Sequence, residues 1–270
     1  MNSIILKAAC CAFFILSISC EVTKKTAIVP SSSIMYMDSP ANSWYEGTPV
    51  GNGRMGAMIY GGIEADTIRT NDDTFWSGEP RDLQRPGTHK YLPQIRQLLL
   101  EEKTGEAQNL INKHLLGPWN QNYMPLADIL FNWSMTGDIS NYRRELDLNR
   151  GVVTITYTQN GVNYKRELFA SFPDQVIVMR VTSDKKNSIK FTVGLGSQIR
   201  HTARIEKNQI IINGQAPCHT DPNYTGVHPP IYKDEKGMRF ESRLKIRESD
   251  GKIVVKENKL QVGGASSVTL

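Results

Sequence analysis

Residues 152–171 read VVTITYTQNGVNYKRELFAS, and this stretch decides the class of fold. On each side of the Asn160-Gly161 pair, apolar residues alternate with threonine, lysine and other polar residues. A period of two residues is typical of a strand with one buried face, and an Asn-Gly pair between two such runs favours a tight hairpin turn. The stretch therefore predicts two antiparallel strands joined by a short turn.

The same alternation continues through most of the sequence after residue 125. Further strands are predicted at 175–182, 189–195, 209–212, 238–247, 252–257 and 259–262. Residues 91–102 and 105–116 instead place apolar side chains at three- and four-residue spacing, which is typical of helices. Many short strands and one helical pair, inserted near residues 90–117, predict a mainly β protein: a large antiparallel β-sandwich of the supersandwich type.

The first residues have the features of an export signal. Lys7 precedes an apolar run at 8–18, which is shorter than the roughly 20 residues that a membrane-spanning helix needs. Residues 17–20, Ser-Ile-Ser-Cys, suit a lipoprotein peptidase, which would leave Cys20 lipidated, and also a general signal peptidase, which would give plain secretion. We expect an exported bacterial protein, periplasmic or on the outer membrane or cell surface, that meets the membrane only through a lipid on Cys20.

The sequence divides into three predicted parts: a signal at 1–20, a polar tether at 21–33 and one folded domain at 34–270. Cys218 is the only cysteine of the predicted domain, so its stability must come from a hydrophobic core and not from an intrachain disulfide. The net charge of +5 is spread along the chain without a basic stripe, which argues against a nucleic-acid partner. Residues 267–270 begin to alternate like another strand, and we expect the sequence to stop inside a longer protein.

Residues 51–56, GNGRMG, have the G-x-G-x-x-G spacing of a dinucleotide-binding loop. Such a loop needs a buried strand before its first glycine and a helix after its third. Here Pro49 lacks the amide donor that a central strand requires, and the apolar run at 57–60 ends at a double glycine. The segment therefore predicts a strand, a glycine turn and a strand, with no bound nucleotide.

Several longer motifs, in one order along the chain, resemble the opening of the glycoside hydrolase family 95 enzymes. These are WYEGTPVGNGRMGAM at 44–58, NDDTFWSG at 71–78, YMPLAD at 123–128, YRRELDL at 142–148, YKRELFAS at 164–171, GQAP at 214–217 and GMRFE at 237–241. The resemblance covers residues 35 to 270. Small departures are Gly47-Thr48, where an alanine-leucine pair is more usual, and Ala127, where glycine is usual.

The resemblance implies a role in fucoside hydrolysis. Family 95 enzymes are inverting α-L-fucosidases, most of which act on α-1,2-linked fucose and some on α-L-galactosides. The matched region is their N-terminal β-sandwich, whereas their catalytic glutamate and aspartate lie on a later (α/α)6 helical barrel. The resemblance therefore implies that this chain is truncated before the catalytic barrel, and it transfers no catalytic residue to any position here.

Asn71, Asp73 and Trp76 are the candidate residues for a domain interface or a sugar-facing surface. On an extended segment Asn71 and Asp73 share one face, and we expect them to hold a loop together beside the indole of Trp76. The adjacent carboxylates of Asp72 and Asp73 point to opposite faces, so they do not form the pair, roughly 6.5–9.5 Å apart, that an inverting glycosidase uses. We therefore expect no catalytic residue and no cofactor.

Cysteine and histidine residues gather at 218–228, but without the spacing of a known metal site. We expect a solvated loop there and no bound metal.

The sequence leaves three functional hypotheses. The first is a non-catalytic N-terminal domain of an α-L-fucosidase-like hydrolase, inactive alone, that packs on and supports the catalytic barrel. The second is a free-standing carbohydrate-binding domain for fucosylated glycans, with Trp76, Trp119, Tyr123 or Trp133 exposed for stacking on sugar rings. The third is a remnant without function. A broad exposed apolar surface would favour a lost partner, and an aromatic platform in a polar groove would favour sugar binding.

Overall fold

The computed structural model describes residues 33–134 and 136–270 of the chain. The described residues form two seven-stranded antiparallel sheets and a smaller three-stranded sheet. The two large sheets bury one shared apolar core, so the predicted mainly β sandwich is confirmed. The predicted signal, nearly all of the tether and the lipidation of Cys20 lie outside the described residues and stay predictions.

The first large sheet contains the predicted hairpin at residues 152–171. Its strands, in spatial order, are β1 (Ile34–Met37), β6 (Ile139–Asp147), β7 (Val152–Gln159), β8 (Val162–Ser171), β9 (Val176–Ser183), β17 (Ser267–Thr269) and β14 (Glu248–Ser249). β7 and β8 pair with Tyr157 opposite Tyr164 and Gln159 opposite Val162. Asn160 and Gly161 join them with φ of 49° and 73°, so both residues lie in the left-handed region that an Asn-Gly hairpin turn requires.

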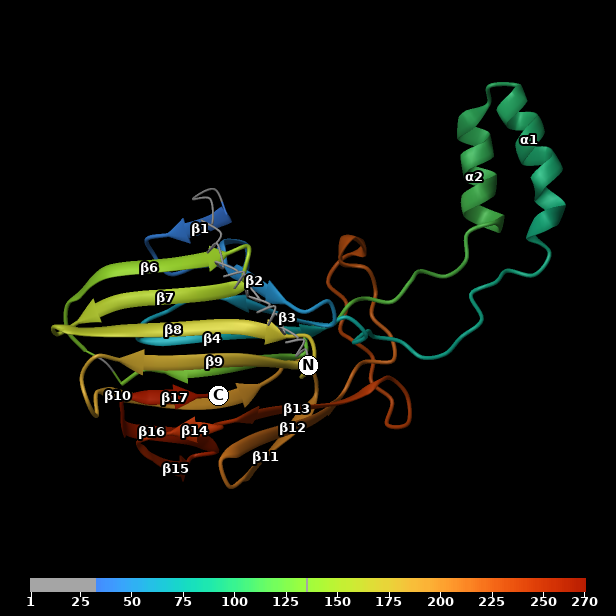
Figure 1. Cartoon of the computed structure of the whole chain (residues 1–270). Coiled ribbons are helices and arrows are strands. Elements are labelled where there is room, and N and C mark those ends of the chain that lie inside the picture. The colour runs from blue at the N-terminus through green and yellow to red at the C-terminus, as the bar shows by residue number, and fades with distance from the viewer. Residues whose placement is uncertain (1–32, 135) are drawn as a thin grey trace, which may run out of the picture.

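The second large sheet and the small sheet contain most of the remaining strands (Figure 1). The second sheet runs in the order β15 (Lys252–Lys256), β16 (Lys259–Ala265), β10 (Ile189–Gly196), β5 (Ala127–Asn132), β4 (Ala65–Asp72), β3 (Met55–Ile59) and β2 (Thr48–Gly51). The small sheet consists of β11 (His201–Glu206), β12 (Gln209–Gln215) and β13 (Arg239–Lys245). Pro49 lies in β2, which is an edge strand as its missing amide donor demands. The glycine-rich segment is a strand, a turn and a strand, as predicted.

The core lies between the two large sheets because alternate residues of β7 and β8 turn inward. Val153, Ile155 and Leu168 are fully buried there, as is Trp133, which follows β5. The Trp133 ring stacks on Phe131 at 5.0 Å, which makes it part of the core. The hypothesis that Trp133 is an exposed sugar-stacking residue is therefore wrong, because the aromatic ring fills the space between the sheets.

Arg166 joins the two large sheets from inside the core. It lies on β8, and its Nη1 donates hydrogen bonds to the Gly62 carbonyl at 2.7 Å and to Asp66 Oδ2 at 3.1 Å. Its Nη2 donates to the Tyr157 hydroxyl at 2.9 Å, and its guanidinium carbon lies 3.8 Å from the centre of the Trp133 ring. A buried charge needs such partners, because an unpaired ion inside the protein is costly.

The predicted helical pair is present as α1 (Leu92–Leu100) and α2 (Thr104–His114). Figure 1 shows it standing clear of the sheets on two long connecting segments, in the blue-green and green part of the chain. Short 3-10 helices occur at η2 (Trp44–Glu46), η3 (Thr88–Tyr91) and η4 (Asn223–Thr225). Among the described residues, no helix is both long enough and apolar enough to span a membrane.

Candidate functional site

Three connections meet at the end of the sandwich from which the helical pair projects (Figure 1). They are residues 73–80 after β4, residues 117–126 before β5, and residues 216–238 between β12 and β13; together we call them the loop cluster. Backbone bonds join them: the Ser77 amide donates to the Asn122 carbonyl and the Gly78 amide to the Pro217 carbonyl, both at 2.9 Å. The predicted interface or sugar-facing residues Asn71, Asp73 and Trp76 lie in this cluster or at its border.

Asp72, the last residue of β4, fixes the first of these loops. Its Oδ1 accepts hydrogen bonds from the Thr74 hydroxyl at 2.6 Å and the Thr74 amide at 3.0 Å, and its Oδ2 pairs with Arg54 at 3.1 Å. Burial pushes the pKa of Asp72 upward, but the Thr74 hydrogen bonds and the Arg54 charge outweigh it, so the pKa lies below its usual value. Asp72 is therefore an ionised structural anchor.

The predicted candidates Asn71, Asp73 and Trp76 lie around this anchor but do not form one bonded cluster. The Asn71 side chain donates to the Met124 carbonyl at 3.4 Å, which links it to the second loop. Asp73 contributes its backbone: its carbonyl accepts a 3.0 Å hydrogen bond from Trp76 Nε1, and its carboxylate is exposed. The loop-holding carboxylate belongs to Asp72, which the shared-face argument passed over. An Asp-x-Thr turn pattern was the signal that could have identified it.

Trp76 and Tyr123 form an aromatic pair across the first two loops. Their ring centres lie 5.4 Å apart with planes inclined by 56°, and their backbones form an antiparallel bridge. The two side chains are 45% and 43% exposed, which is high for large aromatic rings held in place. A second pair, Trp119 and Tyr224, has ring centres 5.6 Å apart. The loop cluster thus presents aromatic surface to solvent.

A polar network that the sequence analysis missed ties the three loops together. Ser77 Oγ lies 2.7 Å from Thr220 Oγ1, and the Asn122 side chain donates to that same threonine oxygen at 2.9 Å. Gln121 accepts a hydrogen bond from the Thr220 amide at 3.1 Å through its Oε1. The network joins three segments that are distant in the sequence, at 77, 121–122 and 220, so no local pattern could have predicted it.

Residues 218–220 belong to this network and are buried or half-buried, whereas residues 223–228 are exposed, as expected for a solvated loop. Cys218 is buried, and Gln121 Nε2 lies 3.2 Å from His219 Nδ1. His219 Nε2 is 3.0 Å from Asp221 Oδ1, so both ring nitrogens have protein partners. No group of three or more metal-ligating side chains occurs within the residues that the structure describes.

Two open hollows border the loop cluster. One, of about 480 Å³, is lined by Trp76–Pro80, Gln121 and 235–238, and the other, of about 400 Å³, lies around Asn122, Ile199 and Tyr232. The first contains charged groups beside an aromatic ring, with Glu79 Oε2 and Lys236 Nζ 2.7 Å apart. Its composition suits a ligand that offers both an apolar face and hydrogen-bonding groups.

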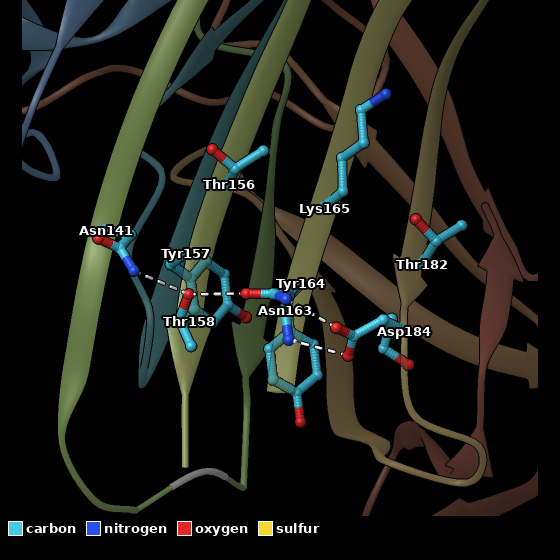
Figure 2. A pocket seen from close by; sticks show the side chains of 10 residues that line it. Asn141, Thr156, Tyr157, Thr158, Asn163, Tyr164, Lys165, Thr182 and Asp184 are labelled. Carbon is cyan, nitrogen blue, oxygen red and sulfur yellow. Dashed lines mark hydrogen bonds between the residues drawn. The ribbon is translucent and has the colours of Figure 1, made fainter. Parts of the chain in front are cut away.

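A third hollow, of about 580 Å³, lies on the outer face of the first sheet, over β6 to β9. Figure 2 shows its polar side chains joined in a row across the strands. Thr158 Oγ1 accepts from Asn141 at 3.2 Å and donates to Asn163 Oδ1 at 2.7 Å, and Asn163 Nδ2 donates to Asp184 Oδ2 at 2.7 Å. These groups satisfy one another, and Tyr157 and Tyr164 beside them are buried. The row stabilises strand pairing and offers no exposed ring for stacking.

The match to a family of known proteins identifies this sandwich as an N-terminal domain of a glycoside hydrolase. The chain belongs to the family described as glycosyl hydrolase family 65, N-terminal domain, whose model matches residues 35–270. The predicted N-terminal glycoside hydrolase domain is thereby confirmed.

The chain is similar in sequence to proteins that are named as α-fucosidases, one from a plant and others from fungi. The chain is 32% identical to Alpha-L-fucosidase 2 of Arabidopsis thaliana over 222 residues, which are 78% of this chain and 26% of that protein. It is 31% identical to Probable alpha-fucosidase A of Aspergillus niger over 194 residues, 67% of this chain and 24% of that protein. The chain therefore spans about a quarter of the length of these relatives and is related to their matched part alone.

Proposed function

We propose that this chain is the non-catalytic N-terminal domain of an α-L-fucosidase-like hydrolase of family 95. In this proposal the parent enzyme cleaves α-L-fucosidic bonds in glycans with inversion, and the present domain packs on the catalytic (α/α)6 barrel and supports it. Two observations support the assignment: the names of the relatives, and the fact that the match covers only about a quarter of their length. The remaining three quarters of such a protein leave room for a separate catalytic domain.

The titratable groups support a non-catalytic role. Burial raises the pKa of Asp66 and that of Asp128, and in both cases an arginine opposes the shift. The Asp66 side chain is fully enclosed beside Arg166, where no substrate can reach it. Glu79 in the loop cluster instead has a lowered pKa, because Lys236 donates a hydrogen bond to it. An inverting pair needs a general acid with a raised pKa facing a base across the substrate.

The observation that carries the packing proposal is the projecting helical pair. α1 and α2 have 9 and 11 residues, and isolated helices shorter than about 12–15 residues are marginal in water. Within them only Ile95 and Ala107 are buried, whereas Leu99 and Leu100 are 50% and 81% exposed. Helices this short, with leucines facing solvent away from the sandwich, fit a partner surface that covers them.

Hydrogen exchange tests this packing directly. The chain alone is compared with the same chain fused to the segment of the Arabidopsis relative that follows its matched part. We expect amide protection of residues 92–114 to rise by about tenfold or more in the fusion, with β7 and β8 unchanged. Leu100→Glu should remove most of the gain. Val255→Glu, a matched change at an exposed valine of β15, should not.

Equal protection of residues 92–114 in the two proteins would contradict the packing proposal. An equally large loss of protection in Val255→Glu and in Leu100→Glu would contradict it as well, because the effect would then not be specific to the helical pair. Neither outcome would alter the family assignment.

A further inference from the structure

Trp76 is held in one orientation at the wall of the 480 Å³ hollow. Its Nε1 donates to the Asp73 carbonyl at 3.0 Å, and the Tyr123 ring packs against it with centres 5.4 Å apart. Nearly half of the side chain, 45%, stays exposed. A flat ring that is both fixed and open loses little freedom when a second flat surface stacks on it.

Glycine backbone lines part of the same hollow. Gly78 and Gly237 have φ of +110° and +90°, a conformation that other residues rarely adopt. A Cβ at Gly78 would lie 2.5 Å from Gln121 Cγ, and one at Gly237 would lie 2.3 Å from the Ala216 carbonyl oxygen. Both positions therefore exclude larger side chains, and backbone atoms border the space beside Trp76.

Charged groups of both signs complete the hollow. Glu79 Oε2 and Lys236 Nζ lie 2.7 Å apart, with side chains 28% and 49% exposed, and Glu235 lines the hollow beside them. The hydrogen bond from Lys236 lowers the pKa of Glu79, so its carboxylate stays an acceptor near neutral pH. The hollow thus offers a carboxylate and an ammonium group beside one aromatic face. The lining residues carry two carboxylates and one ammonium, and Lys233 and Arg81 lie near Glu79, so the hollow has no large excess of either charge that would select a charged ligand.

We propose that this hollow binds one pyranose ring of a neutral glycan. The ring's apolar C–H face stacks on Trp76, and its hydroxyl groups donate to Glu79 and accept from Lys236. The proposal goes beyond the supporting role proposed above: the domain itself contacts sugar, and this contact does not require the catalytic barrel.

The test is a titration of the 270-residue chain with 2′-fucosyllactose and with lactose, followed by indole NMR signals and tryptophan fluorescence. We expect saturable binding, weakened about tenfold or more by Trp76→Ala, which corresponds to about 1.4 kcal/mol. Trp119→Ala is the matched control, because Trp119 is 60% exposed and does not line the hollow. It should change the affinity by less than about twofold.

Glu79→Ala is a second variant for the binding titration. It decides the test if circular dichroism shows that Trp76→Ala does not fold. Glu79 lies on the surface, so we expect a folded variant with at least about fivefold weaker binding. No saturable binding of either sugar by the parent chain would overturn the proposal, as would equal losses in Trp76→Ala and Trp119→Ala. If the chain binds neither sugar but residues 92–114 gain amide protection in the fusion, only the glycan-site proposal is overturned. The packing proposal is then retained.

Discussion

Arg166 shows what a single buried charge contributes to this fold. Arg166→Met would leave the enclosed Asp66 carboxyl without its cation, so we expect the free energy of unfolding to fall by about 3–5 kcal/mol. Arg143→Met is the matched control: Arg143 pairs with Glu145 at 2.5 Å, but its side chain is 46% exposed, and the expected loss is at most about 1 kcal/mol. Urea denaturation of both variants measures the difference. Equal losses would mean that the location of the charge between the sheets is unimportant.

Asp72 predicts a dependence of stability on pH. Its pKa is lowered in the folded chain, so the stability that it contributes is present above the unfolded value of 3.8 and is lost as pH falls through the lower folded value. Between about pH 5 and about pH 3, we expect the parent chain to lose more unfolding free energy than Asp72→Asn, which lacks the titrating group. Denaturation at several pH values provides the comparison.

Thr74→Ala refines this pH experiment. This variant lacks the hydroxyl that donates to Asp72 at 2.6 Å but keeps the ion pair with Arg54. Its loss of unfolding free energy on acidification should therefore lie between the losses of the parent chain and of Asp72→Asn. Parallel pH profiles for all three proteins would show that Asp72 is not the anchor of the loop.

At the residue scale, sequence reasoning expected Asp73 to hold the loop, whereas the structure gives this part to Asp72. Alternation along a strand placed Asn71 and Asp73 on one face, yet β4 ends at Asp72, and the chain turns there. Once the chain leaves the strand, side-chain direction follows the turn and not a period of two residues. Trp76 was identified from its residue type, and its position in an exposed aromatic pair agrees with that choice.

At the scale of single elements, the β7–β8 turn can be tested by a paired glycine substitution. A Cβ at Gly161 would meet no atom within 4 Å, so the cost of Gly161→Ala arises from its φ of +73° alone. We expect a loss of about 1–2 kcal/mol. Gly263→Ala is the control, because its Cβ also meets nothing and its φ lies outside the left-handed region. It should be close to neutral by thermal denaturation. A neutral Gly161→Ala would contradict the role given to this turn.

Elements with a strong local pattern could be predicted, and those held by distant partners could not. The hairpin and the helical pair were predicted to within a few residues, because a period and a turn signal define them locally. The opening of β17 was predicted at 267–270, but β14, which has two residues, exists only because it pairs with β17. Such a short strand carries too few residues to show a period.

For the whole molecule, we predict that the purified 270-residue chain folds but hydrolyses neither an aryl α-L-fucoside nor 2′-fucosyllactose. The folded half follows from a continuous core between two sheets. The inactive half follows from the proposed function, and it agrees with the pairing of Asp72 with Arg54 and the enclosure of Asp66 beside Arg166. Sugar release and circular dichroism test the two halves separately. Turnover that disappears in Asp73→Ala or Glu79→Ala would place an active site in the loop cluster and overturn the proposed function.

The spatial order of the strands was beyond sequence reasoning. The Asn-Gly pair predicts that β7 and β8 are neighbours, but no local feature predicts that β5 lies between β4 and β10 in the second sheet. The loop cluster depends on that order, because it brings together connections that are more than 140 residues apart, as Ser77 and Thr220 are. The candidate site could therefore be predicted only as separate segments.

The position of β17 has a consequence for biosynthesis. This strand, residues 267–269, lies between β9 and β14, although β9 ends more than 80 residues earlier at Ser183. While the ribosome is still making the intervening segment, β9 presents an open row of amide and carbonyl groups. A nascent chain in this state can pair with another nascent chain on the same polysome. Completion of the first sheet thus waits for the synthesis of residues 267–269, which makes the pace of translation and the action of chaperones over this interval a determinant of yield.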